Sequence, residues 1–284
     1  MERLDGRTLS ILRREQLRER VQQCHSQTQI APCLAVVLVG DDPASHVYVR
    51  NKIKSCSEVG VKSLEKRLPA RVSQAQLIQE VQELNANSDI HAILVQLPLP
   101  EGLNSEEVLS QISPLKDADG LVPENLGLLL GDNKRVAPCT PAGVIELLKA
   151  HGIPMNGAHA VVVGRSQIVG KPMALLLLAE NATVTVCHSQ TKDLANHTRQ
   201  ADIVVVAAGR PEFLGKEHFK QGSVVVDVGI HRKANGKLCG DVNSQGLESW
   251  LKALSPVPGG VGPMTITMLL ENTLMLAELQ RGQG

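Results

Sequence analysis

The fold of this chain is decided by residues 159–178, which read His159-Ala-Val-Val-Val-Gly-Arg-Ser-Gln-Ile-Val-Gly-Lys-Pro-Met-Ala-Leu-Leu-Leu-Leu178. A short apolar run stops at Gly164, a glycine-containing turn follows, and a second apolar block opens just after Pro172. Because short apolar runs are typical of buried strands and proline suits the first helical turn, this pattern predicts a strand, a loop and a helix. Such a loop aims backbone N–H groups and the positive end of the helix dipole at one point, where a phosphate can bind.

Two other motifs that use a similar turn are excluded by their spacing. A P-loop requires a shorter distance between its glycines and a hydroxyl residue after its lysine, whereas Gly164 and Gly170 enclose five residues and Pro172 follows Lys171. A nucleophile elbow requires a glycine where Ile168 stands. The loop is therefore expected to be neither a P-loop nor the site of a nucleophilic serine.

A dinucleotide site remains, although the strict glycine fingerprint fails because Ser166 and Val169 occupy its second and third glycine positions. The next apolar strand, 182–187, is followed by His188-Ser189 and lacks the carboxylate that binds the ribose hydroxyl of NAD. Arg165 and Ser166 are suited to bind a 2′-phosphate, so NADP is the predicted cofactor. A phosphate-free turn with a solvated Arg165 stays open as an alternative.

The composition is that of an ordinary globular protein. The 284 residues, 43% of them hydrophobic, are long for one compact domain and suit two. The 29 basic and 29 acidic residues cancel, and one Trp, one Tyr and two Phe are the only aromatic side chains, so neither nucleic acid nor a membrane surface is an expected partner. The polar start and the lack of a long apolar run predict a cytoplasmic protein. Six cysteines and nine histidines show no metal-ligand spacing, which predicts reduced thiols and no metal site.

Apolar periodicity predicts strands and helices in alternation, which indicates an α/β fold with parallel sheets and right-handed crossovers. The loop-rich stretch 114–141 is the predicted hinge between two domains. The predicted helices span 6–23, 45–59, 74–84, 105–112 and 142–150, with one after Pro172 and a last one that ends near Leu279. The predicted strands span 34–39, 61–68, 92–97, 160–163, 182–187, 203–207 and 224–228.

A lysine stands on the apolar face of the predicted helix 45–59. At 100° per residue, Lys52 shares that face with the only tyrosine, Tyr48. A lysine in that position either extends its charged end to solvent or belongs to a site suited to proton transfer, and the two readings stay open. The other residues predicted on this face are Ser45, Val49, Cys56 and Val59.

Three further features lie at strand ends or in loops. Gln96 closes the predicted strand 92–97, where it either belongs to a ligand site, since the carboxyl ends of parallel strands are where ligands bind, or is an amide that satisfies loop backbone. Asp119 precedes a glycine, which indicates either a turn or a ligand carboxylate. The loop 256–263 has three glycines and three prolines, a rigid backbone that a flat ligand can approach closely, or a simple connector.

These residues coincide with a known family. The chain resembles the bifunctional methylenetetrahydrofolate dehydrogenase/methenyltetrahydrofolate cyclohydrolases of the FolD type, and the matching stretches follow the family order over nearly the full length. Ser255 departs from the family pattern, in which threonine is usual at that position. The matching stretches are Tyr48-Val-Arg-Asn-Lys52, Val95-Gln-Leu-Pro-Leu99, Lys116-Asp-Ala-Asp-Gly120, Pro138-Cys-Thr-Pro141 with Gly143, Gly164-Arg-Ser166 with Ile168-Val-Gly-Lys-Pro172, His188-Ser189 with Thr191, and Pro256-Val-Pro-Gly-Gly-Val-Gly-Pro-Met-Thr265.

The resemblance implies a role in one-carbon metabolism and purine biosynthesis. A catalytic, folate-binding domain (1–140) would be completed by the C-terminal helix (268–284), a Rossmann-like domain (141–267) would bind NADP, and folate would occupy a cleft between them in a homodimer. The enzyme would oxidise 5,10-methylenetetrahydrofolate with NADP⁺ and then hydrolyse the 5,10-methenyl product to 10-formyltetrahydrofolate.

The resemblance also implies roles for individual residues. Lys52 would be the main catalytic residue, Gln96 would support it, Tyr48 would orient the folate and Asp119 would bind the pterin. Arg165, Ser166 and Ser189 would hold the 2′-phosphate. Further substrate-binding residues would be Val95, Leu97, Pro258 and Gly259. Further cofactor-binding residues would be Thr140, Gly164, Ile168, Val169, His188, Thr191, Gly209, Ile230, Gly260 and Thr265.

Two other functions remain compatible with the sequence. A dehydrogenase that lacks the hydrolytic step would have almost the same sequence, and a cyclohydrolase assay separates it from the bifunctional enzyme. A catalytically silent NADP-binding sensor or scaffold would bind the cofactor but fail to reduce it with tetrahydrofolate substrates.

Overall fold

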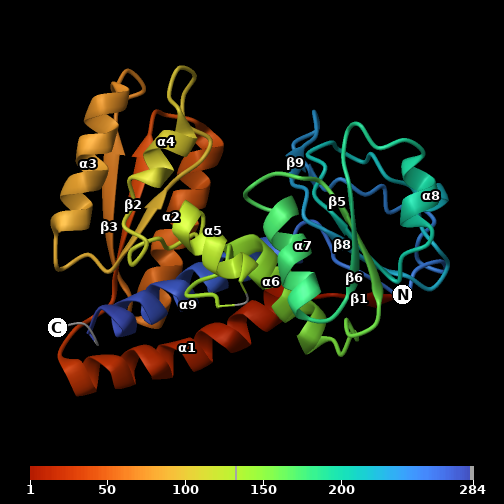
Figure 1. The fold of residues 1–284 in the computed structure, drawn as a ribbon, viewed down its shortest axis with the longest axis horizontal. Helices are drawn as coiled ribbons and strands as arrows, with labels where there is room; N and C mark the ends of the chain where they lie inside the picture. Colours follow the sequence, from red (N-terminus) through yellow and green to blue (C-terminus); the bar gives the residue numbers. More distant parts are fainter. Residues whose placement is uncertain (132, 282–284) are drawn as a thin grey trace. The chain divides into compact units, whose positions relative to one another are not determined.

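The computed structural model describes residues 1–131 and 133–281 and divides into two compact units, each drawn in Figure 1. The six-stranded unit comprises Met1–Ile11 and Pro138–Met268, and the three-stranded unit comprises Leu12–Ala137 and the chain from Leu269 onward. The start of the chain thus groups with the later half, because its first strand joins the larger sheet. Residues 282–284 of the predicted C-terminal segment 268–284 lie outside the described residues.

Helices and strands alternate along most of the chain, and the six-stranded and three-stranded sheets are parallel, which confirms the predicted α/β class, while two short strands form a separate antiparallel pair. The helices are α1 (Gly6–Thr28), α2 (Pro43–Val59), α3 (Gln74–Ala86), α4 (Ser105–Ser110), α5 (Pro123–Leu130), α6 (Cys139–Ala150), α7 (Gly170–Ala179), α8 (Leu194–Thr198) and α9 (Val261–Arg281). The strands are β1 (Glu2–Arg3), β2 (Cys33–Val39), β3 (Lys62–Leu68), β4 (Ala92–Val95), β5 (His159–Val163), β6 (Thr183–Cys187), β7 (Ile203–Val206), β8 (Val224–Asp227), β9 (His231–Arg232), β10 (Leu238–Cys239) and β11 (Ala253–Leu254).

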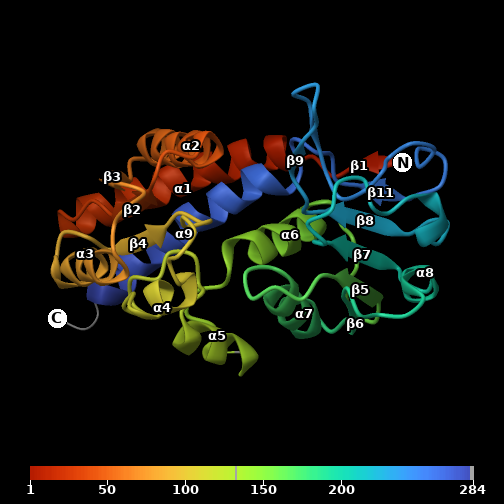
Figure 2. The same ribbon diagram turned by 90° about the horizontal axis from the view of Figure 1, so that it is seen from above.

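The smaller sheet has the order β3-β2-β4, and its central strand β2 is buried along its whole length. Alternate residues of β2, such as Ala35 and Val37, pack into one core with Leu77 and Val81 of α3. Because successive side chains of a strand point to opposite faces, the remaining residues of β2 face the other side, where Figure 2 shows α2. Beyond β4, Asp117 forms an isolated parallel bridge with Ile93 that continues the sheet by one short step.

The larger sheet has the order β1-β11-β8-β7-β5-β6, and all of these neighbours are parallel. The chain leaves β5 for β6 on one side and then crosses to β7, β8 and β11 on the other (Figure 1). The strand order therefore reverses at β5, and open α/β sheets bind ligands at the carboxyl end of such a reversal point. The organising stretch 159–178 supplies β5, the loop after it and α7.

The structure corrects the sequence prediction in two places. The stretch 114–141, expected to be loop, contains α5, which begins with Pro123 in its first turn, and the start of α6 at Cys139. The short strands β1, β9, β10 and β11 and the short helix α8 were not predicted, because segments of two to five residues are too short to show a period. None of the helices that the structure describes combines the length and the hydropathy needed to span a bilayer.

Candidate functional site

The candidate phosphate loop is shaped by two glycines that touch each other. A side chain on Gly164 would collide with the carbonyl of Ala207, which follows β7, and its φ of 139° also disfavours any other residue. A side chain on Gly170, the first residue of α7, would collide with the carbonyl of Gly164. Only glycine at both positions lets the helix approach the end of β5 this closely. In dinucleotide-binding folds, the third glycine of the fingerprint allows the same close packing of helix against strand.

The hydroxyl of Ser166 caps the first turn of α7. Its Oγ accepts the N–H groups of Val169 at 3.1 Å and of Gly170 at 3.4 Å. A serine hydroxyl also has one proton to donate, so the cap leaves Ser166 able to bind an anion oxygen. Arg165, Ser166 and Ile168 are exposed, and the N-terminus of α7 lies directly behind them. The loop thus combines a guanidinium, a hydroxyl and a helix N-terminus, a donor set that fits a phosphate.

The turn after β6 stands beside this loop. Val163 and Cys187 are partners in the parallel register of β5 and β6, so the residues that follow each strand emerge at the same edge. Thr191 Oγ1 accepts the His188 N–H at 2.8 Å, and His188 O accepts the Thr191 N–H at 2.8 Å. This closed turn leaves Ser189 exposed. The edge carries no acidic side chain at 188–191, as the sequence predicted.

The remaining predicted cofactor residues also lie in the six-stranded unit, some after strand ends and some in helices. Gly209 follows β7 with a φ of 67°, and Ile230 follows β8 with 45% of its surface exposed. The hydroxyls of Thr140, in α6, and Thr265, in α9, are 3.1 Å apart. The loop before α9 is closed by a bond from the Gly260 N–H to Pro256 O at 2.8 Å.

In the three-stranded unit, a lysine and an amide meet at the carboxyl end of β4. Lys52 Nζ of α2 donates to Gln96 Oε1 at 2.9 Å, and Gln96 Nε2 donates to Leu97 O at 2.6 Å. Gln96 is 8% exposed, and its own N–H donates to Val37 O of β2. The backbone therefore holds the amide, and the amide holds the ammonium group. The Lys52 ammonium group therefore has a protein partner and is not only solvated. This contact favours the prediction that Lys52 belongs to a site.

The predicted helical face of α2 is only partly buried. Ser45, Val49, Cys56 and Val59 are buried, as expected. Tyr48, however, is 39% exposed and Lys52 is half-buried, so these two stand at the rim of the face. The tyrosine ring, one turn before the lysine, is thus accessible to a ligand.

The turn at 116–120 is made by Asp117, which the sequence analysis did not single out. Asp117 is 1% exposed and accepts the N–H groups of Gly120 at 3.0 Å and Val122 at 2.8 Å, together with Asn125 Nδ2 at 2.9 Å. Burial raises the pKa of the Asp117 carboxyl. Asp119 is half-buried and accepts no hydrogen bond from the described part of the chain. The isolated bridge to Ile93 fixes Asp117 against β4, and Asp119 follows it two residues later, within the turn that Asp117 closes.

A pair of buried carboxylates lies at the carboxyl edge of the larger sheet. Asp227 ends β8 and is 4% exposed, and Asp241, on the chain segment after β10, is fully buried. Burial raises the pKa of Asp227 to about 6, and the neighbouring Asp241 adds to this, although N–H bonds from Asp241, Val242 and Gly229 act in the opposite direction.

This raised pKa predicts how Asp227 contributes to stability. A carboxyl whose pKa is higher in the folded protein stabilises it below the unfolded pKa, and that contribution is lost as the pH rises through about 6. We expect the free energy of unfolding of the parent protein, relative to that of Asp227→Asn, to fall by about 1 kcal/mol between pH 5 and pH 7. The only tryptophan, Trp250, packs in the same unit, so urea unfolding followed by its fluorescence reports on this region. A difference that does not change with pH would contradict the assignment.

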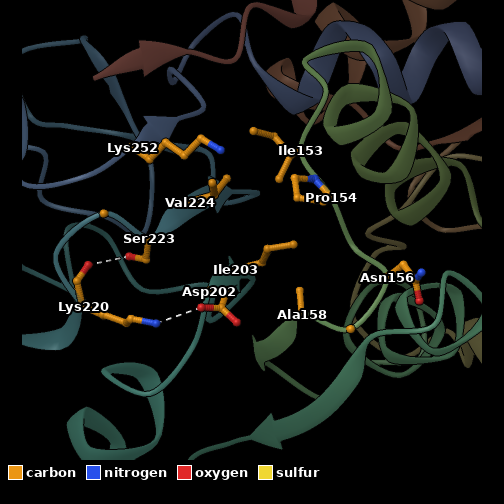
Figure 3. A pocket seen from close by; sticks show the side chains of 12 residues that line it. Ile153, Pro154, Asn156, Ala158, Asp202, Ile203, Lys220, Ser223, Val224 and Lys252 are labelled. Carbon is orange, nitrogen blue, oxygen red and sulfur yellow. Dashed lines mark hydrogen bonds and ion pairs between the residues drawn. The ribbon is translucent and has the colours of Figure 1, made fainter.

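One cavity of the six-stranded unit lies at the opposite edge of the sheet, at the amino ends of the strands (Figure 3). Ala158, Ile203 and Val224 line it, next to the starts of β5, β7 and β8. Lys220 and Asp202 on its wall are bonded to each other at 2.8 Å. None of the predicted site residues lines it, so it is separate from the phosphate loop. In the described ranges, no cluster of three or more His, Cys, Asp or Glu side chains could hold a metal ion.

Comparison with known proteins agrees with this arrangement. Residues 4–119 match the catalytic-domain model, and residues 138–281 the NAD(P)-binding-domain model, of tetrahydrofolate dehydrogenase/cyclohydrolase. The chain is 54% identical over 276 residues to the bifunctional protein FolD of Bdellovibrio bacteriovorus, covering 97% of this chain and 96% of that protein.

Solved structures give the same result. The bifunctional FolD of Campylobacter jejuni superimposes with a TM-score of 0.96 at 47% identity over 99% of each chain. The Trypanosoma brucei FolD, solved with NADP and an inhibitor, superimposes with a TM-score of 0.93 at 40% identity over 98% of this chain and 97% of that one. The chain therefore belongs to the tetrahydrofolate dehydrogenase/cyclohydrolase family, with its NAD(P)-binding domain in the later half.

Proposed function

We propose that this dehydrogenase/cyclohydrolase oxidises 5,10-methylenetetrahydrofolate with NADP⁺ and hydrolyses the 5,10-methenyl product to 10-formyltetrahydrofolate, with Lys52 as the acid-base residue. The observation that carries the proposal is the 2.9 Å bond from Lys52 Nζ to Gln96 Oε1. An amine fixed at a strand end by a backbone-anchored amide is suited to donate and accept protons at one place. Tyr48, one turn before Lys52 on α2, and Asp119, in the turn after the bridge to Ile93, would orient the folate, with Val95, Leu97, Pro258 and Gly259 as further contacts.

NADP is the proposed cofactor, and the six-stranded unit fits it. The Gly164–Gly170 contact leaves the loop backbone open to a pyrophosphate, and Arg165, Ser166 and Ser189 present cationic and hydroxyl donors without an opposing carboxylate. The bound cofactor supplies the hydride acceptor for the oxidation. Ile168, Val169, His188, Thr191 and the other predicted cofactor residues would complete its surroundings. The T. brucei relative was solved with NADP.

The decisive assay follows NADPH formation and methenyltetrahydrofolate disappearance on one preparation supplied with methylenetetrahydrofolate and NADP⁺. The proposal expects both. Accumulation of the methenyl compound would indicate a dehydrogenase without the hydrolytic step. Cofactor binding without any NADPH formation would indicate a silent NADP-binding protein.

Asp119→Asn is expected to weaken folate binding about 10- to 150-fold and to leave NADP⁺ affinity unchanged. A carboxylate can accept two N–H bonds from a pterin edge, and the loss of a hydrogen bond to a charged group costs about 1.5 to 3 kcal/mol. Because Asp117 makes the turn, the melting temperature should stay close to that of the parent. Folate titration and thermal unfolding of the same variant check both statements, and a large drop in melting temperature with normal folate affinity would contradict them.

We further propose a cytoplasmic homodimer. All six cysteines are buried and form no disulfide, as expected in a reducing compartment. In the larger sheet, β6 is an edge strand with Val186 39% exposed, and Leu178 of the adjacent α7 is 59% exposed. An uncovered edge with apolar side chains is a template for pairing with a second copy. Light scattering should give twice the chain mass for the parent and the chain mass for Val186→Lys combined with Leu178→Lys; a monomeric parent would contradict the dimer.

A further inference from the structure

Loops that carry predicted cofactor residues leave neighbouring strands of the larger sheet at its carboxyl edge. The loop 207–210, with Gly209, follows β7, and the segment 228–230, with Ile230, follows β8. The loop 255–260, with Gly260, follows β11. None of these loops has regular structure of its own, so their positions depend on what holds them.

Asp241 holds the first of these loops through its backbone. Its Oδ2 accepts the N–H groups of Ala208 at 2.6 Å and Gly209 at 2.9 Å, and its Oδ1 accepts the N–H of Arg210 at 2.9 Å. His231 Nε2 donates to the same Oδ1 at 2.7 Å. A carboxylate offers about four acceptor positions, so this one is saturated. One buried side chain thus joins the loop after β7 to the residue that follows Ile230.

Asp227 connects the same point to the other loops. Its Oδ1 accepts the N–H groups of Gly229 at 3.0 Å and Asp241 at 2.9 Å, and its own N–H donates to Ser255 Oγ at 2.8 Å, at the start of the loop 255–260. A side chain on Gly229 would collide with the Asp241 carboxylate, and one on Gly240 would collide with the Asp227 carboxylate. The two acids are therefore fitted against backbone that has no room for a side chain.

This arrangement is costly for stability. Two neighbouring carboxylates are removed from water, and a buried charge is expensive unless it is paired. Backbone N–H groups donate nearly all of the hydrogen bonds that offset this cost. The remaining bond comes from the ring of His231, whose side chain is 23% exposed. Natural proteins accept such local costs mainly where function requires a fixed geometry.

We propose that Asp241 and His231 are positioning residues for the cofactor. Through their mutual bond they set the loop 207–210 against the segment that carries Ile230, without touching the cofactor themselves. The proposal rests on the proposed NADP-dependent function. It identifies a contact in this chain, from the His231 ring to Asp241, that should control cofactor affinity more than the chemical step.

The test compares His231→Leu, which removes the N–H donor, with His231→Gln, whose amide N–H can reach the same oxygen. In the full-length enzyme, His231→Leu should raise the Kd for NADP⁺ about 5- to 20-fold, less than the roughly 10- to 150-fold of a lost direct bond to a charged group, because His231 acts only through the position of the loop. His231→Gln should stay within about twofold of the parent. At saturating NADP⁺ and folate, kcat of both variants should stay within about twofold, because the loss acts on binding. Hydrogen exchange of peptides covering 207–231 should be faster in the leucine variant alone.

Asp241→Asn should weaken NADP⁺ more than His231→Leu, because the amide presents N–H groups to backbone N–H groups. If Asp241→Asn does not fold, the His231 pair decides the question. Unchanged NADP⁺ affinity in His231→Leu would overturn the proposal, whether or not its melting temperature falls. Equal weakening in the leucine and glutamine variants would overturn the role of the N–H bond. A parent enzyme that does not bind NADP⁺ would instead refute the proposed function itself.

Discussion

Arg165→Ala should weaken NADP⁺ binding about 10- to 150-fold and leave NAD⁺ binding almost unchanged. The change removes a guanidinium from the exposed loop between β5 and α7, where the Ser166 hydroxyl and the helix N-terminus are the remaining anion donors. A charge-assisted bond to a 2′-phosphate contributes about 1.5 to 3 kcal/mol, which corresponds to that range of affinity. Because NAD⁺ lacks the 2′-phosphate, its affinity should not depend on the Arg165 guanidinium.

Titration of both cofactors into the parent and the variant measures the effect. Arg199→Ala is a suitable control, because Arg199 is an exposed arginine of the same unit that donates to Glu217 O. It should bind both cofactors as the parent does. Equal use of NADP⁺ and NAD⁺ by the parent enzyme would refute the assignment of Arg165.

The sequence was sufficient where the structure depends on a local pattern. Strand, turn and helix at 159–178 follow from apolar periodicity, two glycines and one proline, and the structure adds only the reason for the glycines, which is contact between Gly164 and Gly170. Lys52 was singled out as a candidate because it interrupts the apolar face of a predicted helix. The absence of a carboxylate after β6 could be read from the sequence because, in dinucleotide-binding folds, the residue that binds the ribose stands at the end of the second strand.

The residues that sequence reasoning missed act across long sequence separations. Asp117 and Asp119 are indistinguishable in a turn pattern, and only the hydrogen bonds that Asp117 accepts from Gly120 and Val122 show that the first makes the turn. Asp241 follows β10 and binds backbone more than thirty residues earlier, after β7. The first strand pairs with Ala253–Leu254, near the other end of the chain. No local period encodes such pairings, because they are set by how the sheet assembles.

The two half-reactions require different contributions from Lys52. Hydride transfer needs two rings held in alignment more than it needs a proton donor. In hydrolysis of the methenyl cation, water must lose protons as it attacks, and a ring nitrogen must gain one as the C–N bond opens. The second step is therefore general acid-base work, which typically contributes about 10²- to 10⁴-fold in rate. Lys52 Nζ, held by Gln96 Oε1, is the candidate for that work.

Lys52→Met, which keeps the volume of the stem and removes the amine, should therefore reduce the cyclohydrolase rate about 10²- to 10⁴-fold. Hydride transfer should fall less, and NADP⁺ affinity should not change, because Lys52 belongs to the three-stranded unit and the phosphate loop to the other. Lys54→Met is the matched control, since Lys54 lies half a turn away on α2 with its side chain 76% exposed. Methenyl disappearance and NADPH formation are followed separately on each preparation. If hydrolysis by Lys52→Met stays within about threefold of the parent, well short of the lower acid-base figure, the contact with Gln96 is structural and the proposed mechanism is wrong.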